Sequence, residues 1–412
     1  MFREGLVDKI LRSIKKLIPR SVFIFFAPSY HWALAVIGAV WYGFPARSLK
    51  IIGVTGTKGK STTVYMITKI LADIGLPVAA VGSLGYKIRD KEWPNTLKMT
   101  MPGRTKLQKF LWQAKRAGCE YAVLEVTSEG LAQHRLTGMD IDCAVFTNLH
   151  REHLESHGSL ANYLKAKQKL FLKTKHIQVL NIDDPYFEKF ANFPARIKVT
   201  YGMGIAMISS LKFKNLKLKL LGDFNEYNAL AALAVADAYR LDLDQAVKTL
   251  NAIESIPGRM ETIEAESKSL KFKVVVDYAH TPDSLQAVYR NLRPQAERLI
   301  GVLGAAGGGR DKWKRPEFGK IASNWCDEIV LTNEDPYDED PGQIIEQVAL
   351  GVSKSKKLTK ILDRGEAIRH ALAIAQKGDT VVITGKGNET SIAVAGGKKI
   401  PWSDKAEVLK SL

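Results

Sequence analysis

Apolar and polar positions alternate in a regular way from residue 49 onward. Short apolar runs of strand length are followed by stretches whose apolar residues recur every three or four positions, the spacing of one helix face. We expect strands near 50–55, 78–81, 121–128, 143–149, 178–184, 274–279, 299–311, 328–332 and 379–387, and helices near 60–74, 105–117, 159–172, 282–292, 316–324, 341–352 and 364–376. This alternation is typical of parallel sheets with helices on both faces.

A glycine-rich loop joins the first strand to the first helix. It comprises Thr55, Gly56, Thr57, Lys58, Gly59, Lys60, Ser61 and Thr62. Its glycines let successive backbone N–H groups point at one anion, Lys60 can reach the outer phosphates, and Ser61 can offer a hydroxyl to Mg²⁺. The general P-loop pattern is not met in full, because Val54 stands where that pattern has its first glycine. A turn that merely starts a helix is the alternative, but the flanking strand and helix favour nucleoside-triphosphate binding.

The strand and helix signals fall into two sets, which meet near Pro257 and Gly258. We therefore predict a P-loop parallel-sheet ATPase domain over 49–257 and a smaller Rossmann-like α/β domain over 258–412. Residues 1–48 form a third segment that is helical and hydrophobic.

This N-terminal segment has two parts. Residues 5–18 have the pattern of a basic amphipathic helix. Residues 22–44 are long and apolar enough to span a bilayer, although Pro28, Ser29, Tyr30 and His31 interrupt the apolar run near one end. A signal anchor or signal peptide would export the ATP loop, so neither fits. Three interpretations stay open: a helical hairpin at the inner membrane face, a docking surface for a partner, or helices packed on the catalytic body.

The net charge of +17 favours partners or substrates that carry negative charge. The lysines are scattered rather than interleaved with aromatic residues, so no nucleic-acid partner is expected. Cys119, Cys143 and Cys326 have no pair or metal-ligand spacing, which indicates reduced, packed thiols in the cytosol.

Two further groups of residues could hold a metal. Glu125 ends an apolar strand, where a carboxylate at the same sheet edge as the loop could bind Mg²⁺. His150, His153 and His157 cluster after the next strand. Zinc is an alternative for these histidines, but their spacing is not that of a known zinc helix and no cysteine joins them.

Nine short motifs follow one another along the chain. They are TGTKGKSTT, EVTSEGLAQHR, TNLHREHLESHG, YLKAKQKLF, GDFNEYN, PGRME, DYAHTPD, GGGRDKWKRP and GKGNE. In this order they resemble the Mur ligase family over roughly residues 49 to 390. The resemblance implies an ATP-dependent ligase of peptidoglycan precursor synthesis, which adds an amino acid to UDP-MurNAc-L-Ala-D-Glu or a similar muropeptide through an acyl phosphate.

The resemblance also implies a catalytic group of residues. Lys60 and Ser61 would hold the ATP phosphates and Mg²⁺, and Glu125 and His153 would complete two Mg²⁺ sites. Lys167 matches the lysine that carries a carbamate in this family, a change that turns a cation into an anionic metal ligand.

Further contacts are carried over from the family by motif. ATP contacts fall on the loop and on Asn225, Asn228, Arg259 and Asp277. Contacts to the muropeptide or the amino acid fall on Thr100, Ser128, Gln133, Arg135, His280, Arg310, Asp311, Asp335, Pro336, Tyr337, Gly385 and Glu389. We expect a cytoplasmic monomer with peripheral membrane contact through 1–48.

The chain departs from the family in three places, one of which is Asn388 in GKGNE, where the family usually has histidine. The family's N-terminal uridine-binding domain is not recognisable before residue 49, which leaves open whether the acceptor carries UDP or a lipid. Where diaminopimelate-adding members have Asp-Asn-Pro-Arg, this chain has Glu334, Asp335, Pro336 and Tyr337. The arginine that would pair with the far carboxylate is absent there, so the added amino acid stays undecided.

Two other functions remain as alternatives. A related ligase of folylpolyglutamate or cyanophycin type would share the loop and the metal residues, but EVTSEGLAQHR and DYAHTPD favour the muropeptide branch. A membrane-associated scaffold could bind nucleotide without turnover, but the complete set of motif residues favours an enzyme.

Overall fold

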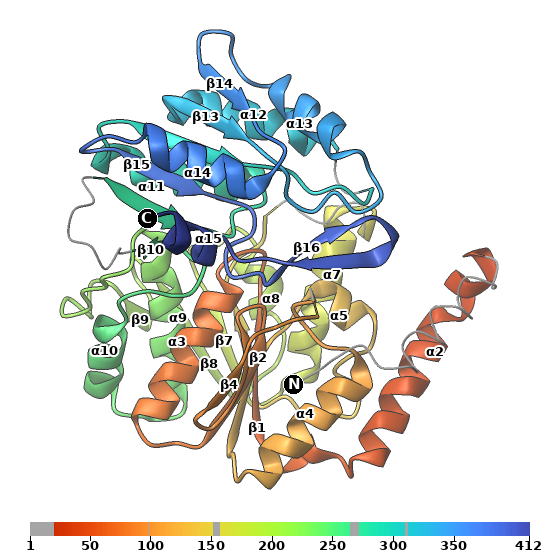
Figure 1. Cartoon of the computed structure of the whole chain (residues 1–412). Helices are drawn as coiled ribbons and strands as arrows, with labels where there is room; N and C mark the ends of the chain where they lie inside the picture. The colour runs from red at the N-terminus through yellow and green to blue at the C-terminus, as the bar shows by residue number, and fades with distance from the viewer. Residues whose placement is uncertain (1–19, 98, 151–156, 264–271, 310–311) are drawn as a thin grey trace. The chain divides into compact units, whose positions relative to one another are not determined.

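The computed structural model describes residues 20–97, 99–150, 157–263, 272–309 and 312–412. These residues form two compact units. The first contains the described residues up to Lys219 together with Asp223–Ile253, and the second contains Leu220–Gly222 and the described residues from Glu254 to Leu412. Each unit has its own sheet covered by helices, which confirms the predicted α/β class (Figure 1). The division into 1–48, 49–257 and 258–412 stays a prediction.

The first unit is built on a nine-stranded sheet, counted over the described residues, in the order β4-β3-β2-β5-β1-β6-β7-β8-β9. All neighbouring strands are parallel except at the edge, where β2, β3 and β4 pair antiparallel. The strands are β1 (Lys50–Thr55), β2 (Val78–Gly82), β3 (Gly85–Ile88), β4 (Lys91–Trp93), β5 (Tyr121–Glu125), β6 (Cys143–Phe146), β7 (Ile177–Asn181), β8 (Ile197–Gly202) and β9 (Ile208–Ser209).

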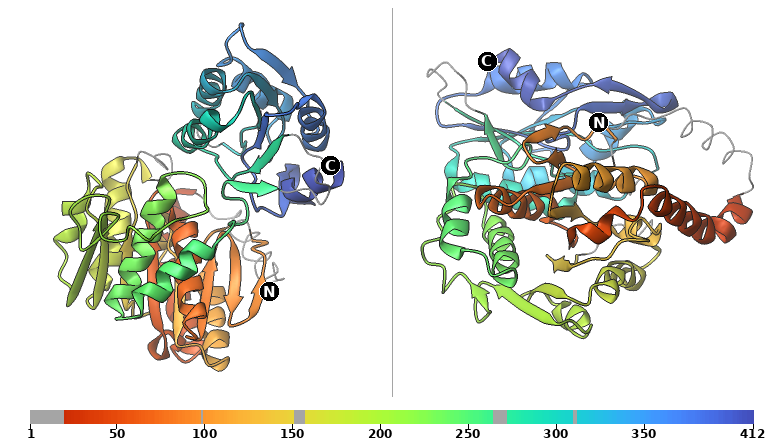
Figure 2. Two further views of the ribbon diagram at one scale, coloured as in Figure 1. Left: turned by 90° about the vertical axis from the view of Figure 1, so that its left-hand side faces the viewer. Right: turned by 90° about the horizontal axis from the view of Figure 1, so that it is seen from below.

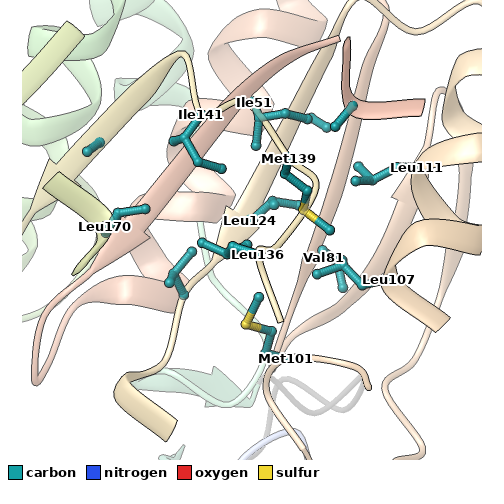
Figure 3. Close-up of a cluster of buried hydrophobic side chains, with 14 of the residues drawn as sticks. Ile51, Val81, Met101, Leu107, Leu111, Leu124, Leu136, Met139, Ile141 and Leu170 are labelled. Atoms are coloured by element: carbon teal, nitrogen blue, oxygen red, sulfur yellow. The ribbon is translucent and has the colours of Figure 1, made fainter. Parts of the chain in front are cut away.

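Helices cover both faces of this sheet. They are α2 (Arg20–Trp41), the short 3-10 helix η1 (Pro45–Ser48), α3 (Lys60–Asp73), α4 (Arg104–Arg116), α5 (Ser128–Ala132), α7 (Leu160–Lys173), α8 (Phe187–Ala191), α9 (Phe224–Ala238) and α10 (Leu243–Ala252). Helix α3 packs against α9 and α10 as well as against β1, β2 and β5. Figure 3 shows the core that involves α4: Leu107 and Leu111 lie with Ile51, Val81 and Leu124 of the strands. The sheet therefore stands between two apolar layers, with β1 and β5 at its centre.

The second unit has a six-stranded sheet, again counted over the described residues, in the order β10-β11-β15-β12-β13-β14, parallel except for β10. Its strands are β10 (Glu261–Ile263), β11 (Lys273–Val276), β12 (Leu299–Leu303), β13 (Glu328–Leu331), β14 (Lys357–Lys360) and β15 (Thr380–Ile383), with a separate hairpin of β16 (Ser391–Val394) and β17 (Lys398–Pro401) around η3 (Ala395–Gly397). Its helices are α11 (Pro282–Leu292), η2 (Arg293–Gln295), α12 (Lys314–Trp325), α13 (Pro341–Ala349), α14 (Arg364–Ile374) and α15 (Asp404–Ser411). One core cluster includes residues of α11, α12 and α13, and another includes residues of α14 and α15.

The expected strands over 299–311 and 379–387 were predicted too long. They end at Leu303 and Ile383, where glycine-rich loops begin. Glycine loses more conformational freedom than other residues in a strand and is common in turns that need positive φ, and Gly308, Gly309, Gly385 and Gly387 all have positive φ. The elements that the alternation missed are mainly short or polar, such as β4, β14 and the β16–β17 hairpin.

Most of the hydrophobic segment 22–44 lies in α2, which is helical through position 28 and ends at Trp41. In the part of the chain that the structure describes, no helix combines the length and apolar character needed to cross a bilayer. Ala35 and Ala39 are buried, and a Cβ on Gly38 would lie 3.3 Å from Thr105 Cα on α4. The later half of α2 thus packs on α4, while its earlier half extends beyond α4 (Figure 2). The basic helix expected at 5–18 lies outside the described residues.

Candidate active site

The glycine-rich loop lies between β1 and α3, as predicted. Gly59 is the N-cap of α3 with φ of 80°, and a Cβ there would lie 2.3 Å from Asn228 Oδ1. A Cβ on Gly56 would lie 1.8 Å from Thr147 Oγ1. Both positions are too close to neighbouring atoms for any side chain, so glycine is required for the shape of the loop.

The segment after β6 holds this loop in place. Thr57 N–H donates to Asn148 O at 2.8 Å, and Lys58 N–H donates to Asn148 Oδ1 at 2.8 Å. In return, Thr147 Oγ1 donates to Lys58 O at 2.7 Å. The loop is thereby fixed before any ligand arrives, which lowers the entropy cost of binding a phosphate group.

Lys60 begins α3 and its side chain folds back over the loop. Its Nζ donates to Gly56 O at 3.0 Å and to Thr57 O at 2.8 Å. A bound phosphate chain would offer stronger, charged acceptors in place of these two carbonyls. The position is the one expected for the lysine of a nucleotide-binding loop.

Glu125 ends β5 and accepts hydrogen bonds from two serines. Its Oε1 accepts from Ser61 Oγ at 3.0 Å, and its Oε2 accepts from the N–H and the Oγ of Ser83 at 2.7 and 2.9 Å. The carboxylate is 3% exposed. The carboxylate and the two serine hydroxyls thus lie together beside the loop. Mg²⁺ prefers such oxygen ligands and keeps its other coordination positions for water and phosphate.

Lys167 lies in the interior on α7. Its Nζ donates to Gly56 O at 2.6 Å and lies 4.5 Å from the centre of the Tyr163 ring, and the residue is 1% exposed. Burial disfavours the charged form of an amine, and CO₂ reacts with the neutral form. The position of Lys167 at the glycine loop therefore fits a carbamylated lysine, although this change remains a proposal.

The expected histidine cluster is only partly described. His153 lies outside the described residues, and His157 places Nε2 3.0 Å from Ser128 Oγ, with its pKa lowered chiefly by burial. Over the ranges that the structure describes, no group of three His, Cys, Asp or Glu side chains could hold a metal ion. Zinc therefore gains no support from the described histidines.

Two predicted ATP contacts meet the loop directly. Asn225 and Asn228 are both buried on α9, and Asn228 Nδ2 donates to Asn225 Oδ1 at 3.1 Å. Thr63 Oγ1 donates to Asn228 Oδ1 at 3.3 Å. Thr55 and Thr62 are buried at the two ends of the loop. Asn228 therefore lies against α3 and Gly59, and the contact of both asparagines with ATP stays a prediction.

The predicted acceptor contacts of the first unit follow β5 or precede α4. Arg135 donates from Nη1 to Met101 O and from Nη2 to Gln133 Oε1, the latter at 2.8 Å. Ser128 is the first residue of α5 and is 4% exposed. Thr100 is half-buried next to Met101. The structure thus brings Arg135 and Gln133 together, and Arg135 also bonds Met101, the chain neighbour of Thr100.

In the second unit, Arg259 and Asp277 occupy one corner. The Arg259 guanidinium lies 4.5 Å from the centre of the Tyr278 ring. Asp277 accepts from the N–H groups of Met260 and Ala279, each at 2.7 Å. Burial raises the pKa of Asp277, and the charge of Arg259 opposes that shift. Asp277 therefore fixes the backbone around Arg259.

A second corner of this unit gathers most of the predicted amino-acid contacts. Asp335 Oδ1 accepts from Lys386 Nζ at 3.0 Å and from Ala393 N–H at 2.6 Å, and Lys386 also pairs with Glu389. A Cβ on Gly385 would lie 2.7 Å from Glu334 Oε2, and burial raises the pKa of Glu334 to about 7. A buried lysine and three carboxylates thus lie around the end of β15.

The other predicted contacts of the second unit are Pro336, Tyr337, His280, Arg310 and Asp311. Pro336 is buried, and Tyr337 has φ of 52° and donates its N–H to Ala393 O at 3.1 Å. His280 is exposed, with Nδ1 2.9 Å from Tyr278 O. Arg310 and Asp311 lie outside the described residues.

Sequence reasoning missed three polar residues that the structure places at these sites: Ser83, Asn148 and Lys386. Each lies within three residues of the end of a predicted strand. These strands are parallel to, and next to, other strands that end at the site. A search of every strand end for polar side chains would have found them.

Comparison with known proteins adds to this geometry. The Mur ligase middle domain matches residues 54–236, and the Mur ligase glutamate ligase domain matches residues 258–387. The UDP-N-acetylmuramyl-tripeptide synthetase of Roseiflexus sp. is 37% identical over 425 residues, which cover 93% of this chain and 82% of that protein. The UDP-N-acetylmuramoyl-L-alanyl-D-glutamate--2,6-diaminopimelate ligase of Fusobacterium nucleatum is 38% identical over 394 residues, with 90% and 79% covered.

Solved structures give the same fold. A UDP-N-acetylmuramoyl-L-alanyl-D-glutamate--2,6-diaminopimelate ligase is 32% identical with a TM-score of 0.59, covering 88% of this chain and 78% of that chain. The folylpolyglutamate synthase of Mycobacterium tuberculosis reaches a TM-score of 0.69 at 18% identity, with 86% and 92% covered. At that identity the likeness shows the fold alone.

Proposed function

The chain belongs to the Mur ligase family of ATP-dependent amide ligases, and from this premise we propose that it adds one amino acid to UDP-MurNAc-L-Ala-D-Glu or a similar muropeptide. The observation that supports the reaction most directly is the convergence of Lys60, Ser61 and Glu125 at one end of the central sheet. The acceptor is proposed from the names of the relatives that are 37–38% identical over 90–93% of this chain.

The reaction needs a carboxylate to be made electrophilic. We propose that the γ-phosphoryl group of ATP moves to the acceptor carboxylate to give an acyl phosphate, which an amine then attacks with release of phosphate. Lys60 would leave the carbonyls of Gly56 and Thr57 and neutralise charge on the phosphoryl oxygens. The fixed backbone N–H groups of the loop would orient the phosphate chain.

We propose that one Mg²⁺ ion would be held by Ser61, Ser83 and Glu125. A second would be held by Lys167, as a carbamate, and His153. When bound, Mg²⁺ stabilises the negative charge that spreads over the phosphoryl oxygens during transfer. Glu125 supplies a full negative charge to its site, and the serines supply neutral oxygens.

In the second unit we propose that the corner formed by Asp335, Lys386 and Glu389 recognises the incoming amino acid. A zwitterion needs one cationic and one anionic partner, and this corner offers both. Arg259 and Asp277 retain their proposed role as ATP contacts. The absence of an arginine at position 337 favours an amino acid other than diaminopimelate.

The deciding experiment is phosphate release from ATP by purified protein with Mg²⁺ and bicarbonate. UDP-MurNAc-L-Ala-D-Glu is combined with lysine, diaminopimelate or other amino acids, and each mixture is compared with one that lacks the acceptor. Release that requires both the nucleotide sugar and one amino acid supports the proposal and identifies that amino acid. Protein that binds ATP but shows no stimulation with any pair contradicts it, and folate or lipid-linked muropeptide acceptors are then compared in the same assay.

We also propose a cytoplasmic monomer that contacts the membrane surface through α2. Phe26, Tyr30, Ile37 and Trp41 are exposed and lie at spacings of four, seven and four residues, which places them on one face of the helix. Ala35 and Ala39 lie on the opposite face, packed toward α4. A helix with this aromatic stripe suits the interface of a bilayer rather than its interior.

Charge favours a lipid surface over a protein partner for this stripe. Residues 1–20 contain six basic residues, Arg3, Lys9, Arg12, Lys15, Lys16 and Arg20, against two acidic ones, Glu4 and Asp8. We expect sedimentation with anionic phosphatidylglycerol vesicles but not with neutral phosphatidylcholine vesicles. The double variant Ile37→Ser/Trp41→Ser should weaken vesicle binding by at least about tenfold. The matched control is Leu350→Ser, which changes another exposed residue in the second unit; equal binding of the double variant and the wild type contradicts the membrane contact.

A further inference from the structure

The segment that follows β6 bonds to the glycine loop at alternate residues. Asn148 O accepts the N–H of Thr57 at 2.8 Å, and the N–H of His150 donates to Thr57 Oγ1 at 2.9 Å. The residue between them, Leu149, donates its N–H to Asp184 Oδ2 instead, also at 2.9 Å. Residues 148 and 150 therefore bind the loop, and residue 149 is held by a side chain from outside the loop.

Asp184 is itself fixed by its own turn. It lies three residues after the end of β7, the strand that is the parallel neighbour of β6. Its Oδ1 accepts the N–H of Tyr186 at 2.9 Å, two residues further on, which leaves Oδ2 for Leu149. The residue is 7% exposed, and burial raises the pKa of Asp184 while these two N–H groups oppose the shift. Both oxygens of a buried carboxylate are thus bonded to backbone N–H groups, one of them in the segment that bonds to the loop.

Asn181 holds the same segment two residues earlier. It is the last residue of β7, and its Nδ2 donates to Thr147 O at 2.8 Å while its Oδ1 accepts the N–H of Asp183 at 3.1 Å. Thr147 is the residue whose Oγ1 would lie 1.8 Å from a Cβ on Gly56. Asn181 therefore fixes the backbone of the residue that packs against the first glycine of the loop.

We propose that Asp184 and Asn181 are positioning residues for the nucleotide, which act through residues 147–150 to keep the glycine loop in the conformation that binds the phosphates. A loop that is fixed in advance loses less conformational entropy when it binds its ligand. Loosening of residues 147–150 therefore weakens nucleotide binding without removing any group that touches the nucleotide. The inference rests on the proposed function only in taking the glycine loop as the nucleotide site.

The test is a calorimetric titration of the full chain with ADP in the presence of Mg²⁺. Asp184→Asn keeps the size of the side chain but places an amide NH₂ against one of the two N–H groups, so the dissociation constant for ADP should rise about tenfold. Asn181→Asp places a carboxylate oxygen against Thr147 O and should raise it by a similar factor. The matched control is Tyr239→Phe, which removes a hydrogen bond to Asp142, just before β6 begins. It should leave the affinity for ADP within about twofold of wild type.

A double-mutant cycle separates positioning from a general loss of stability. Thr57→Val removes the hydroxyl that accepts the N–H of His150, and with it one of the links through which Asp184 acts on the loop. In the Thr57→Val background, Asp184→Asn should therefore weaken ADP binding by no more than about threefold. Tyr239→Phe should lower the melting temperature of the ligand-free protein and leave ADP binding unchanged in both backgrounds.

The inference is overturned if Asp184→Asn weakens ADP binding by the same factor in both backgrounds, or if folded Asp184→Asn and Asn181→Asp proteins bind ADP as wild type does. If only one of the two variants folds, that variant is carried through the cycle. Failure of both to fold also overturns the inference, because the two side chains would then support the whole unit rather than the loop.

These outcomes are separate from those that test the proposed function. The ADP titration needs no acceptor, so its result does not depend on which carboxylate the enzyme acts on. A wild-type protein without acceptor-dependent phosphate release contradicts the ligase assignment and leaves the coupling between Asp184 and Thr57 as measured.

Discussion

Glu125→Gln is the sharpest perturbation of the metal site, because it removes one charge and keeps the shape of the side chain. In the structure, Oε2 accepts two hydrogen bonds from Ser83 and Oε1 accepts one from Ser61. A glutamine can keep its oxygen toward Ser83 and donate from its amide to Ser61 Oγ. No buried polar atom then loses its partner.

The expected change in folding stability is therefore small. Each of the three bonds loses about 1 kcal/mol when its acceptor becomes neutral, or about 3 kcal/mol together. The substitution also removes the desolvation cost of a buried carboxylate, several kcal/mol for a residue that is 3% exposed. This gain offsets the loss. We expect the free energy of unfolding to change by no more than about 2 kcal/mol. Glu125→Ala leaves the Ser83 N–H without its acceptor and should cost about 1–3 kcal/mol more.

The effect on turnover should be much larger. Loss of the carboxylate from the proposed Mg²⁺ site removes charge stabilisation from phosphoryl transfer, and we expect kcat to fall about 10²–10³-fold, or about 3–4 kcal/mol. Nucleotide binding in EDTA should be unchanged, and only its strengthening by Mg²⁺ should be lost. Phosphate release and nucleotide titrations across a range of Mg²⁺ concentrations measure both. A folded Glu125→Gln protein with wild-type turnover and Mg²⁺ dependence would refute the assignment.

Three further changes test other parts of the chain. Lys167→Ala should lower turnover at least about a hundredfold, and formate should restore part of it by supplying an anion in place of the carbamate. Arg364→Met should lower the free energy of unfolding by about 3–5 kcal/mol in denaturant titrations, because Asp404, 0% exposed and 2.7 Å from Arg364 Nε, is left as an unpaired buried charge. Glu334→Gln should raise stability by about 3 kcal/mol at pH 8 and leave it unchanged below pH 4.5. The sign follows because the folded state raises the pKa of Glu334 from 4.5 to about 7, so its ionised form destabilises the fold as pH rises.

Each of these has its own control. If Lys167→Ala turns over at the wild-type rate without formate, chloride or another added anion, no carbamate is needed. Arg364→Met/Asp404→Leu should recover most of the lost stability, and a double variant as unstable as Arg364→Met would contradict the charge argument. A constant stability difference between Glu334→Gln and wild type from pH 4 to pH 8 would show that Glu334 does not titrate as described.

Most of the architecture could be predicted from the sequence because buried parallel strands are continuous apolar runs. The strands β1, β5 and β6 are buried along almost their whole length and were predicted. The polar strands β4 and β14 lie at sheet edges, where one side of the strand has no neighbour and polar residues are tolerated. Their sequences carry no two-residue alternation, so the pattern could not reveal them.

The site was predictable where chemistry restricts the residue type. Only glycine fits at positions 56 and 59, and a lysine and a hydroxyl must follow at fixed spacing. Ser83 was not predictable in this way, because a serine after a strand has many roles. Its place beside Glu125 depends on β2 being the neighbour of β5, which is a property of the strand order and not of the local sequence.

Helix periodicity distinguishes Lys167 from the other lysines of α7, although its proposed role came only from the family resemblance. On α7 the buried positions Tyr163, Ala166 and Leu170 define the inward face, and Lys167 lies four residues after the first and three before the last. Lys165 and Lys169 point outward and are exposed. A lysine on the inward face of an amphipathic helix is costly as a cation. The chain keeps an amine where leucine would be more stable, and the reason we propose is that an amine beside Gly56, unlike an alkyl chain, can be converted into a metal-binding carbamate.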